Sequence, residues 1–483
     1  MSDLNVVAAT PVIIMAASGT LAMTAGLLPG RTMRRHGPAF VGIAGIAAAA
    51  VMSIVLWGDR EEAFGGGLRA DRFSLLFNLL FLSVALVTIL LAWREPAAVD
   101  RRGEYVALLL ISATGMMLVA GAGDLITIFL GIEILSVSLY VLCALEVWRE
   151  RSLESGLKYL IAGAVGASIL LYGLTFLFGA TGSTNLTVIG EQLAGSSFTG
   201  EPLVVAAMAL IAAGLAFKAS AAPFHMWTPD VYEGAPTTVT AFMSTAVKAA
   251  AFAAFLRIFS GVFTDIQDDW SVVIAVLAVA SIVVGNVAAL VQPNMKRLLA
   301  YSSIAQAGYL LIGVATGSID GAEAVIYYLL AYAAMTLAAF AVVIIREREV
   351  EDGDSVAALA GYGRARPVIG VVLTIAMLSL AGFPPLSGFI GKFLLFGAAV
   401  EEEMTWLAIV GAVGSMVSLG YYLRVVWVAW SPGPEGGPRK VLPIPGPVGI
   451  ATIAAGISVV VLSLMASPVL DACRGAAESL LAP

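Results

Sequence analysis

Long apolar stretches alternate with short polar connections along the whole chain. About fourteen of these stretches reach the roughly 20 apolar residues that an α-helix needs to cross a bilayer. Their cores lie at 7–29, 39–57, 72–93, 104–121, 125–146, 155–179, 202–232, 236–259, 270–291, 297–315, 322–345, 367–400, 404–430 and 446–467. The pattern predicts an all-α polytopic membrane protein with about fourteen transmembrane helices.

Two of the stretches, 202–232 and 367–400, are too long for one straight crossing and carry internal prolines. Pro223 lies in the first, and Pro384-Pro385 in the second. Proline removes a backbone donor and breaks a helix interior, so we expect both segments to be discontinuous helices. Interrupted segments at corresponding places in two halves are typical of inverted-repeat transporters.

The two halves of the chain can be laid over each other, with Asp124–Tyr140 beside Asn294–Leu310 and Pro223 beside Pro385. This overlay predicts two inverted five-helix repeats, each with one broken helix. The expected divisions are 1–103 with three transmembrane helices, 104–260 as the first repeat, 261–430 as the second, and 431–483 as a last transmembrane helix and tail.

Composition excludes a soluble globular chain, because 60% of residues are apolar and only 12% are charged. The net charge of −7 sits mainly in loops and does not indicate nucleic-acid binding. Neither a G-x-G-x-x-G motif nor a P-loop is present, and Cys143 and Cys473 fit no metal or redox spacing. We therefore expect that this chain holds no cofactor or metal of its own.

Basic residues are distributed unevenly over the connections. The odd-numbered loops carry sixteen: Arg31, Arg34, Arg35, Arg94, Arg101, Arg102, Arg149, Arg151, Lys296, Arg297, Arg346, Arg348, Arg364, Arg366, Arg439 and Lys440. The even-numbered loops and the tail carry four: Arg60, Arg69, Arg72 and Arg474. The positive-inside rule then predicts cytoplasmic odd loops and both termini outside.

Four of the six lysines lie inside apolar stretches, where they are joined by one carboxylate. These residues are Lys158, Lys218, Lys248, Lys392 and Glu133. An ionisable group in hydrocarbon costs several kcal/mol and usually marks an ion or proton pathway. Lysine changes its protonation state readily when buried, whereas arginine stays charged. The distribution therefore indicates proton handling.

Each candidate also has a purely structural interpretation. Glu133 could only join helices by hydrogen bonding, and Lys218 and Lys392, beside the two breaks, could snorkel to an interface. Lys248 is midway along its helix and too deep to snorkel easily. Lys158 lies a few residues past the charged loop 149–154, so snorkelling and proton transfer stay open.

His225 lies at the first helix break, where it could pass protons near neutral pH or cap the broken helix. Polar residues in the second half could hold water or serve as ordinary helix contacts: Ser302, Ser303, Gln306 and Tyr309. Both interpretations stay open for these residues.

Three runs of sequence resemble subunit N of bacterial proton-translocating NADH:quinone oxidoreductase, respiratory complex I. They are 217–237, with its Pro223-Phe224-His225-Met226-Trp227 core, and its continuation 242–250; the stretch 285–309 with Lys296-Arg297-Leu298-Leu299-Ala300-Tyr301-Ser302-Ser303; and Leu380–Phe393. The first motif is common to a wider group of antiporter-like subunits, and the continuation Val231–Pro236 favours subunit N.

The resemblance implies a proton relay through Glu133, Lys218, Lys248 and Lys392, with Lys158 as a further matching lysine. It also implies that NADH, FMN, iron–sulfur clusters and quinone are bound by partner subunits. Expected partners are antiporter-like subunit M and small membrane subunits, in the bacterial plasma membrane. The alternative is a subunit of a multisubunit cation/proton antiporter without a redox partner.

Overall fold

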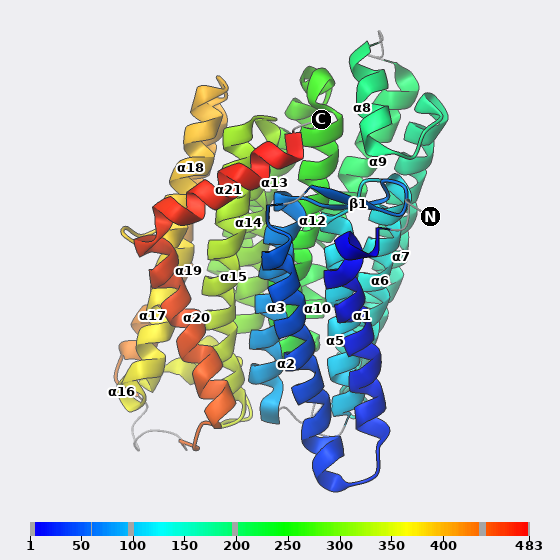
Figure 1. Cartoon of the computed structure of the whole chain (residues 1–483). Helices are drawn as coiled ribbons and strands as arrows, with labels where there is room; N and C mark the ends of the chain where they lie inside the picture. Colours follow the sequence, from blue (N-terminus) through cyan, green and yellow to red (C-terminus); the bar gives the residue numbers. More distant parts are fainter. Residues whose placement is uncertain (1–4, 59, 95–100, 196–200, 434–440, 482–483) are drawn as a thin grey trace.

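The computed structural model describes residues 5–58, 60–94, 101–195, 201–433 and 441–481, and these form a bundle of long, nearly parallel helices (Figure 1). In this part of the chain, 13 helical stretches are long and apolar enough to cross a membrane. They are α1 (Val6–Leu27), α2 (Arg31–Val55), α3 (Arg72–Leu91), α5 (Arg102–Ala120), α6 (Leu125–Cys143), α7 (Glu150–Thr181), α9 (Pro202–Ala219), the run Thr237–Val262, the run Thr264–Leu290, α14 (Met295–Ala315), α15 (Ile319–Glu347), α19 (Thr405–Trp430) and α20 (Gly446–Leu464). The chain is a multi-pass, all-α membrane protein, as the apolar pattern predicts.

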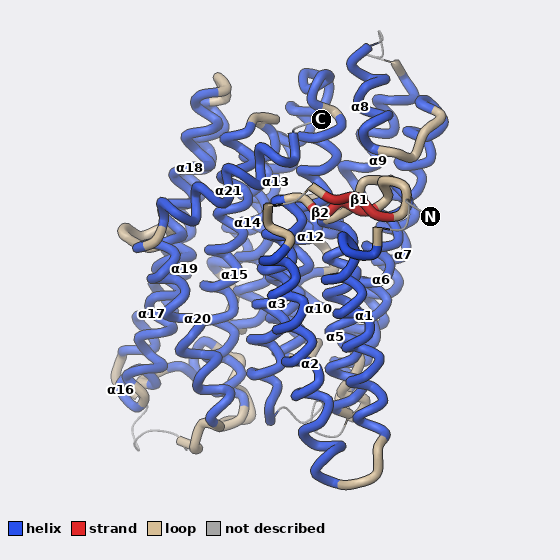
Figure 2. The backbone as a smooth tube through the Cα atoms, viewed as in Figure 1, coloured by secondary structure: helices blue, strands red, loops and turns tan. Residues whose placement is uncertain are grey.

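Shorter elements complete the chain. The run Thr237–Val262 consists of α11 (Thr237–Phe242), the π-helical turn η2 (Met243–Val247), α12 (Lys248–Phe255) and the π-helical turn η3 (Leu256–Val262), and the next run consists of η4 (Thr264–Ile266) and α13 (Gln267–Leu290). Further short helical pieces are η1 (Ala92–Arg94), α8 (Leu186–Gly195), η5 (Val356–Leu359) and α16 (Tyr362–Ala365). Strands β1 (Glu61–Ala63) and β2 (Leu68–Ala70) form one antiparallel hairpin (Figure 2).

Both expected helix breaks are present. The first long segment is divided into α9 and α10 (Thr228–Gly234), and the second into α17 (Pro367–Ala381) and α18 (Ser387–Glu401). A left-handed residue ends the first half of each pair, Ser220 with φ 62° and Gly382 with φ 82°. The prolines Pro223 and Pro384 follow within the connecting turns, where no helical hydrogen bond is needed.

The centre of the bundle is the run from α11 to η3 together with α14 and α15. In the most apolar 18 residues of each segment, 100% of the residues are buried in the run and 94% in each of α14 and α15. In the outer helices α2 and α20, 39% and 33% of the corresponding residues are buried. Helix α12, which carries Lys248, is therefore enclosed by protein on every side.

The hairpin, α21 (Ala466–Leu481) and both chain ends lie at the same end of the bundle. Helix α21 runs across this end, over α3 and α15, instead of continuing as an unstructured tail (Figure 1). It is anchored there because Ser479 Oγ accepts a hydrogen bond from the Phe73 amide at 3.1 Å. The side chain of Asn5 donates to Glu61 of the hairpin, which holds the start of α1 at the same end.

The two halves share a local arrangement. Asp124 caps α6 and pairs with Asn185 in an isolated β-bridge, and Asn294 caps α14 and pairs with Ser355 in the same way. Such a correspondence is what an inverted repeat produces. The repeat divisions and the number of crossings stay predictions.

Several basic residues that we assigned to loops are buried at helix ends. Lys296 is 0% exposed, Arg346 3% and Arg102 4%. Each is compensated by hydrogen bonds to backbone carbonyls, such as Lys296 Nζ to the Ala235 carbonyl at 2.8 Å. Arg439 and Lys440 lie outside the described residues.

Close packing of α13 on α14 generates a prediction about stability. A Cβ atom at Gly285 would lie 2.4 Å from the Ala305 backbone nitrogen, and helix backbones cannot yield as a flexible side chain can. We expect Gly285→Ala to destabilise the chain by about 1–3 kcal/mol, the usual range for overpacking. Thermal melting of the purified protein in detergent measures the change.

The matched control is Gly397→Ala in α18, where an added Cβ meets no atom within 4 Å. Alanine is a better helix former than glycine, so this variant should melt at or slightly above the wild-type temperature. Equal melting temperatures for the two variants would contradict the close approach of α13 and α14.

Candidate functional site

Lys248 lies at the start of α12, directly after the π-helical turn η2, and is 2% exposed. Its Nζ donates to the Ala219 carbonyl at 2.7 Å and to the Ser303 carbonyl at 2.9 Å. Ala219 is the last residue of α9, so this ammonium group caps the carbonyl end of the first broken helix. π-Helical turns occur frequently at functional sites.

Lys392 occupies the corresponding position at the second break. Its Nζ donates to the Leu380 carbonyl at 3.0 Å, to the Ala381 carbonyl at 3.3 Å and to Ser415 Oγ at 2.9 Å. The same group lies 4.6 Å from the centre of the Tyr309 ring. Leu380 and Ala381 end α17, so a second buried ammonium group caps the carbonyl end of the second broken helix.

One electrostatic arrangement therefore stabilises both lysines. The last carbonyls of a helix lack intrahelical partners, and the helix macrodipole places roughly half a negative charge at that end. Among the described residues, neither Lys248 nor Lys392 has a carboxylate within ion-pairing distance. A partial charge stabilises an ammonium group less than a full carboxylate does.

Lys218, one residue before Ala219, is 4% exposed and donates to Ser136 Oγ at 2.6 Å. Its ammonium group also lies 5.6 Å from the ring centre of Tyr159 and 5.9 Å from that of Tyr140. Ser136 is one turn beyond Glu133 on α6, so the carboxylate and the ammonium group share one face of the site.

Glu133 forms no ion pair with Lys218 in this structure. Its Oε1 is buried without a hydrogen-bond partner among the described residues. An unpartnered buried carboxylate oxygen is costly. Lys218 instead contacts Ser136, on the same helix as Glu133, and the Ser136 hydroxyl donates to the Ile132 carbonyl.

Gln306 connects α14 to the second break. Its Nε2 donates to the Leu380 carbonyl at 3.1 Å, the same carbonyl that Lys392 contacts, and to Tyr422 at 3.1 Å. Its Oε1 accepts from Tyr328. Gln306 lies one turn beyond Ser303, whose carbonyl holds Lys248, so α14 carries a polar row from the first break to the second.

Lys158 is on the side of the bundle, with 44% of its side chain exposed. Its Nζ lies 2.7 Å from a Glu154 carboxylate oxygen and 2.9 Å from one of Asp230. Arg297 pairs with Asp230 at 2.8 Å and with Glu233 at 3.0 Å. These contacts hold α10, the second half of the first broken helix, between α7 and α14.

His225 is half-buried in the first break, beside the exposed Met226, and it is not hydrogen-bonded to any of the lysines in the described part of the chain. Contacts with Ala219, with Ser303 of α14 and with Leu380 link Lys218, Lys248 and Lys392, and Glu133 lies one turn from Ser136, which Lys218 contacts. Among the described residues, Lys158 contacts Glu154 and Asp230 instead. Two contact residues were not singled out from sequence, Ser136 and Ser415. Ser136 had a usable signal, since it is three residues beyond Glu133 on the same helix face.

A further buried lysine was also missed. Lys296 Nζ is 3.9 Å from a Glu347 carboxylate oxygen, and Thr237 Oγ1 donates to the same carboxylate at 2.8 Å. No group of three or more His, Cys, Asp or Glu side chains suited to a metal ion occurs among the described residues.

Two helix breaks with buried lysines in a multi-pass bundle define an antiporter-like membrane subunit. The family model described as NADH:quinone oxidoreductase/Mrp antiporter, TM, matches residues 122–418. The NADH-quinone oxidoreductase subunit N of Trichlorobacter lovleyi is 40% identical over 91% of this chain and 90% of its own length. The chain belongs to the family of NADH-quinone oxidoreductase subunit N.

Solved structures share the fold. Respiratory complex I from Thermus thermophilus contains a chain with a TM-score of 0.82 and 37% identity, which covers 95% of this chain and 98% of that one. The Mrp complex from a Dietzia species contains a chain with a TM-score of 0.86 but 22% identity, covering 99% and 98%. The second likeness concerns the fold alone.

Gln306 provides a test of the polar row. Replacement by leucine removes the acceptor of the Tyr328 hydroxyl group, whereas Tyr422 keeps its contact with Ser302, and a buried group left unpaired costs roughly 1–3 kcal/mol. We expect Gln306→Leu to lose most of its proton pumping in membrane vesicles, normalised to assembled protein. The control Gln292→Leu removes only a local hydrogen bond to Ala288 and should pump normally. Normal pumping by both variants would separate the two breaks functionally.

Proposed function

We propose that this chain, a membrane-arm subunit of NADH:quinone oxidoreductase, translocates protons through Glu133, Lys218, Lys248 and Lys392. The observation that supports the relay best is the pair of ammonium groups of Lys248 and Lys392, each held by the carbonyl end of a broken helix without a carboxylate partner. The drive for translocation is quinone reduction elsewhere in the complex.

In the proposed cycle, a proton on Lys218 is stabilised when Glu133 approaches and released when the two separate. Lys218 and Lys248 are linked through α9, because the ammonium group of Lys248 donates to the carbonyl of Ala219, the residue after Lys218. Gln306, Tyr422 and ordered water would carry the proton from the Ser303 region to Lys392. Moving one proton against about 150–200 mV requires roughly 3.5–4.6 kcal/mol, within reach of one buried ion pair that forms and breaks.

Lys158 and His225 have separate proposed roles at the edge of the relay. The two ion pairs of Lys158 favour a role in positioning α10, and His225 lies where protons could enter the first break. Neither residue is placed between two of the buried lysines.

The match to complex I supports membrane-arm partner subunits for this chain, and so do exposed residues at the two helix breaks. Met226 is 80% exposed and Phe383 51%. Irregular backbone facing lipid is not tolerated inside the hydrocarbon layer, so protein should cover both breaks. We propose that antiporter-like subunit M and the small membrane subunits do so, and that NADH, FMN, iron–sulfur clusters and quinone are bound by partners.

We further propose that the chain lies in the bacterial plasma membrane with both termini outside. The asymmetry of sixteen basic residues against four supports this orientation, with the loop 346–366 in the cytoplasm. The alternative function, a subunit of a cation/proton antiporter, has only fold-level support from the Mrp complex.

Lys248 should release and regain a proton, so a permanent charge cannot replace it. Arginine keeps the charge and hydrogen bonds but does not deprotonate. We expect Lys248→Arg to lower proton pumping nearly as much as Lys248→Ala, although the arginine variant should assemble better. The measurement is pumping by the complex in membrane vesicles, normalised to assembled complex.

Lys158→Arg is the matched variant, because its exposed ion pairs with Glu154 and Asp230 tolerate either cation. We expect this variant to pump near the wild-type rate. Near wild-type pumping by Lys248→Arg would instead show that Lys248 is a fixed charge.

Glu133 should modulate Lys218 electrostatically, so removal of its carboxylate should lower coupled activity without preventing assembly. We expect Glu133→Ala and Glu133→Gln to reduce pumping by at least about tenfold, the effect of ~1.4 kcal/mol on a barrier. The exposed carboxylate Glu154 supplies a control, since Glu154→Gln should change little. Normal pumping by the assembled Glu133 variants would reduce this residue to a helix contact.

A further inference from the structure

A buried ion pair lies outside the relay, at the end of the bundle that carries both termini. Arg257 of η3 contacts Asp71, the residue before α3, with Nη1–Oδ2 at 2.8 Å and Nη2–Oδ1 at 2.9 Å. The two side chains are 2% and 7% exposed. The guanidinium also donates to the Ala120 carbonyl at 2.9 and 2.7 Å, so Arg257 joins three elements.

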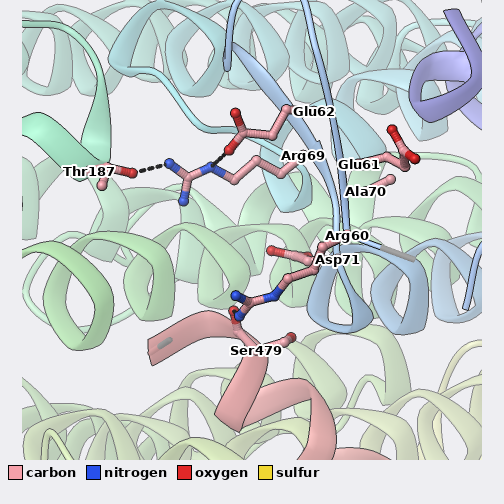
Figure 3. Close-up of a pocket in the computed structure, with 8 residues that line it drawn as sticks. All are labelled: Arg60, Glu61, Glu62, Arg69, Ala70, Asp71, Thr187 and Ser479. Carbon is pink, nitrogen blue, oxygen red and sulfur yellow. Dashed lines mark hydrogen bonds and ion pairs between the residues drawn. The ribbon is translucent and has the colours of Figure 1, made fainter. Parts of the chain in front are cut away.

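Two cavities reach this pair from the surface. One of about 200 Å³ is lined by Asp71, Arg69 and Thr187 (Figure 3), and another of about 390 Å³ is lined by Arg257, Arg69 and Thr187. Arg69 lines both cavities. Its guanidinium donates a hydrogen bond to Thr187, and its Nε lies 3.5 Å from a Glu62 carboxylate oxygen. Burial and the neighbouring charge of Arg257 lower the pKa of Arg69. The cavities are polar and large enough for water.

A polar face of α3 continues inward from Asp71. Ser74 and Asn78 follow it at three and seven residues, on the same side of the helix. Asn78 is 4% exposed, and its Oδ1 has no hydrogen-bond partner among the described residues. An orphaned buried amide oxygen indicates a site for a hydrogen-bonded water.

Asn78 and Lys248 lie at nearly the same depth. Asn78 is seven residues from Asp71, about 10.5 Å along α3, and Lys248 is nine residues from Arg257, about 13.5 Å along its helix. Helix α3 packs against both η2 and α12. The polar face of α3 therefore leads from the level of Lys248 to the cavities at the terminus-bearing end.

We propose that Asp71 and Arg257 gate a path from Lys248 to this end, and that the Asp71 carboxylate accepts the proton that leaves Lys248. The ammonium group of Lys248 becomes a neutral amine, and the proton passes through water beside Asn78 to Asp71. Protonated Asp71 weakens its pair with Arg257 and then loses the proton to cavity water. This inference rests on the proposed relay.

A purely structural pair predicts different mutant behaviour. Asparagine caps a helix as well as aspartate does, so Asp71→Asn keeps the cap of α3. It leaves the Arg257 charge unbalanced, which the double variant Asp71→Asn/Arg257→Gln corrects. Replacement of both partners by uncharged residues avoids an uncompensated buried charge, which is the costly outcome of removing one partner alone.

The test is proton pumping and quinone reduction by the assembled complex in vesicles. We expect at least a fivefold loss of coupled turnover in Asp71→Asn and in the double variant, with recovery in Asp71→Glu. The control Asp124→Asn, another capping aspartate at the same end, should behave as wild type. Recovery in the double variant, or no loss in Asp71→Asn, would overturn the proposal.

A second experiment needs no substitution in the pair. Thr187→Cys places a thiol in both cavities, and a bulky thiol reagent can fill them after assembly. The two native cysteines are fully buried, and an exposed Glu402→Cys variant controls for labelling. We expect labelling at 187 alone to inhibit coupled turnover at least fivefold. Full turnover after complete labelling would overturn the path, and normal pumping by Lys248→Arg would instead overturn the relay itself.

Discussion

The structure depends on protein groups that stabilise buried ammonium groups inside a bilayer, where no water solvates their charge. A charged side chain at the centre of a bilayer costs several kcal/mol unless protein groups replace its water. Here the carbonyl ends of two interrupted helices do so, Ala219 for Lys248 and Leu380 with Ala381 for Lys392. The breaks are therefore the means by which the lysines are stabilised, and the lysines satisfy the carbonyls that the breaks expose.

This mutual compensation explains the arrangement around it. The lysine-bearing helix α12 is enclosed because partial charges stabilise an ammonium group only where water is excluded. Helix α14 lies next to it and contributes the Ser303 carbonyl on one turn and Gln306 on the next. The charged contacts of α10 and the Asp71–Arg257 pair lie outside this centre, where they fix the ends of the helices that the centre requires.

The broad architecture was predictable because it follows from local composition. Apolar length identifies the spans, and Pro223 and Pro384 identify the breaks, since each acts through its own backbone. The candidate residues were also predictable, because an ionisable group within an apolar run is visible in the sequence. Assignment of a basic residue to a loop because other basic residues lie nearby was less reliable. Lys296 was assigned to a loop in this way, although its side chain is fully buried.

The partners of the lysines were not predictable. Lys248 contacts carbonyls 29 and 55 residues away, and any residue offers a carbonyl, so no side-chain pattern identifies them. The same holds for α21, whose position depends on contacts of Ser479 with the start of α3. The contact of Lys218 with Ser136 likewise depends on how α6 and α9 are placed, each of which packs against α7.

The central claim is that a lysine held by helix carbonyls changes its protonation state. Nitrogen-15 labelling of the lysine side chains in this subunit alone, followed by assembly into the complex, gives six Nζ signals, of which Lys248 is assigned by its loss in Lys248→Gln. During turnover, we expect the Lys248 signal to move between ammonium and neutral amine. An ammonium signal that persists unchanged throughout turnover would contradict it.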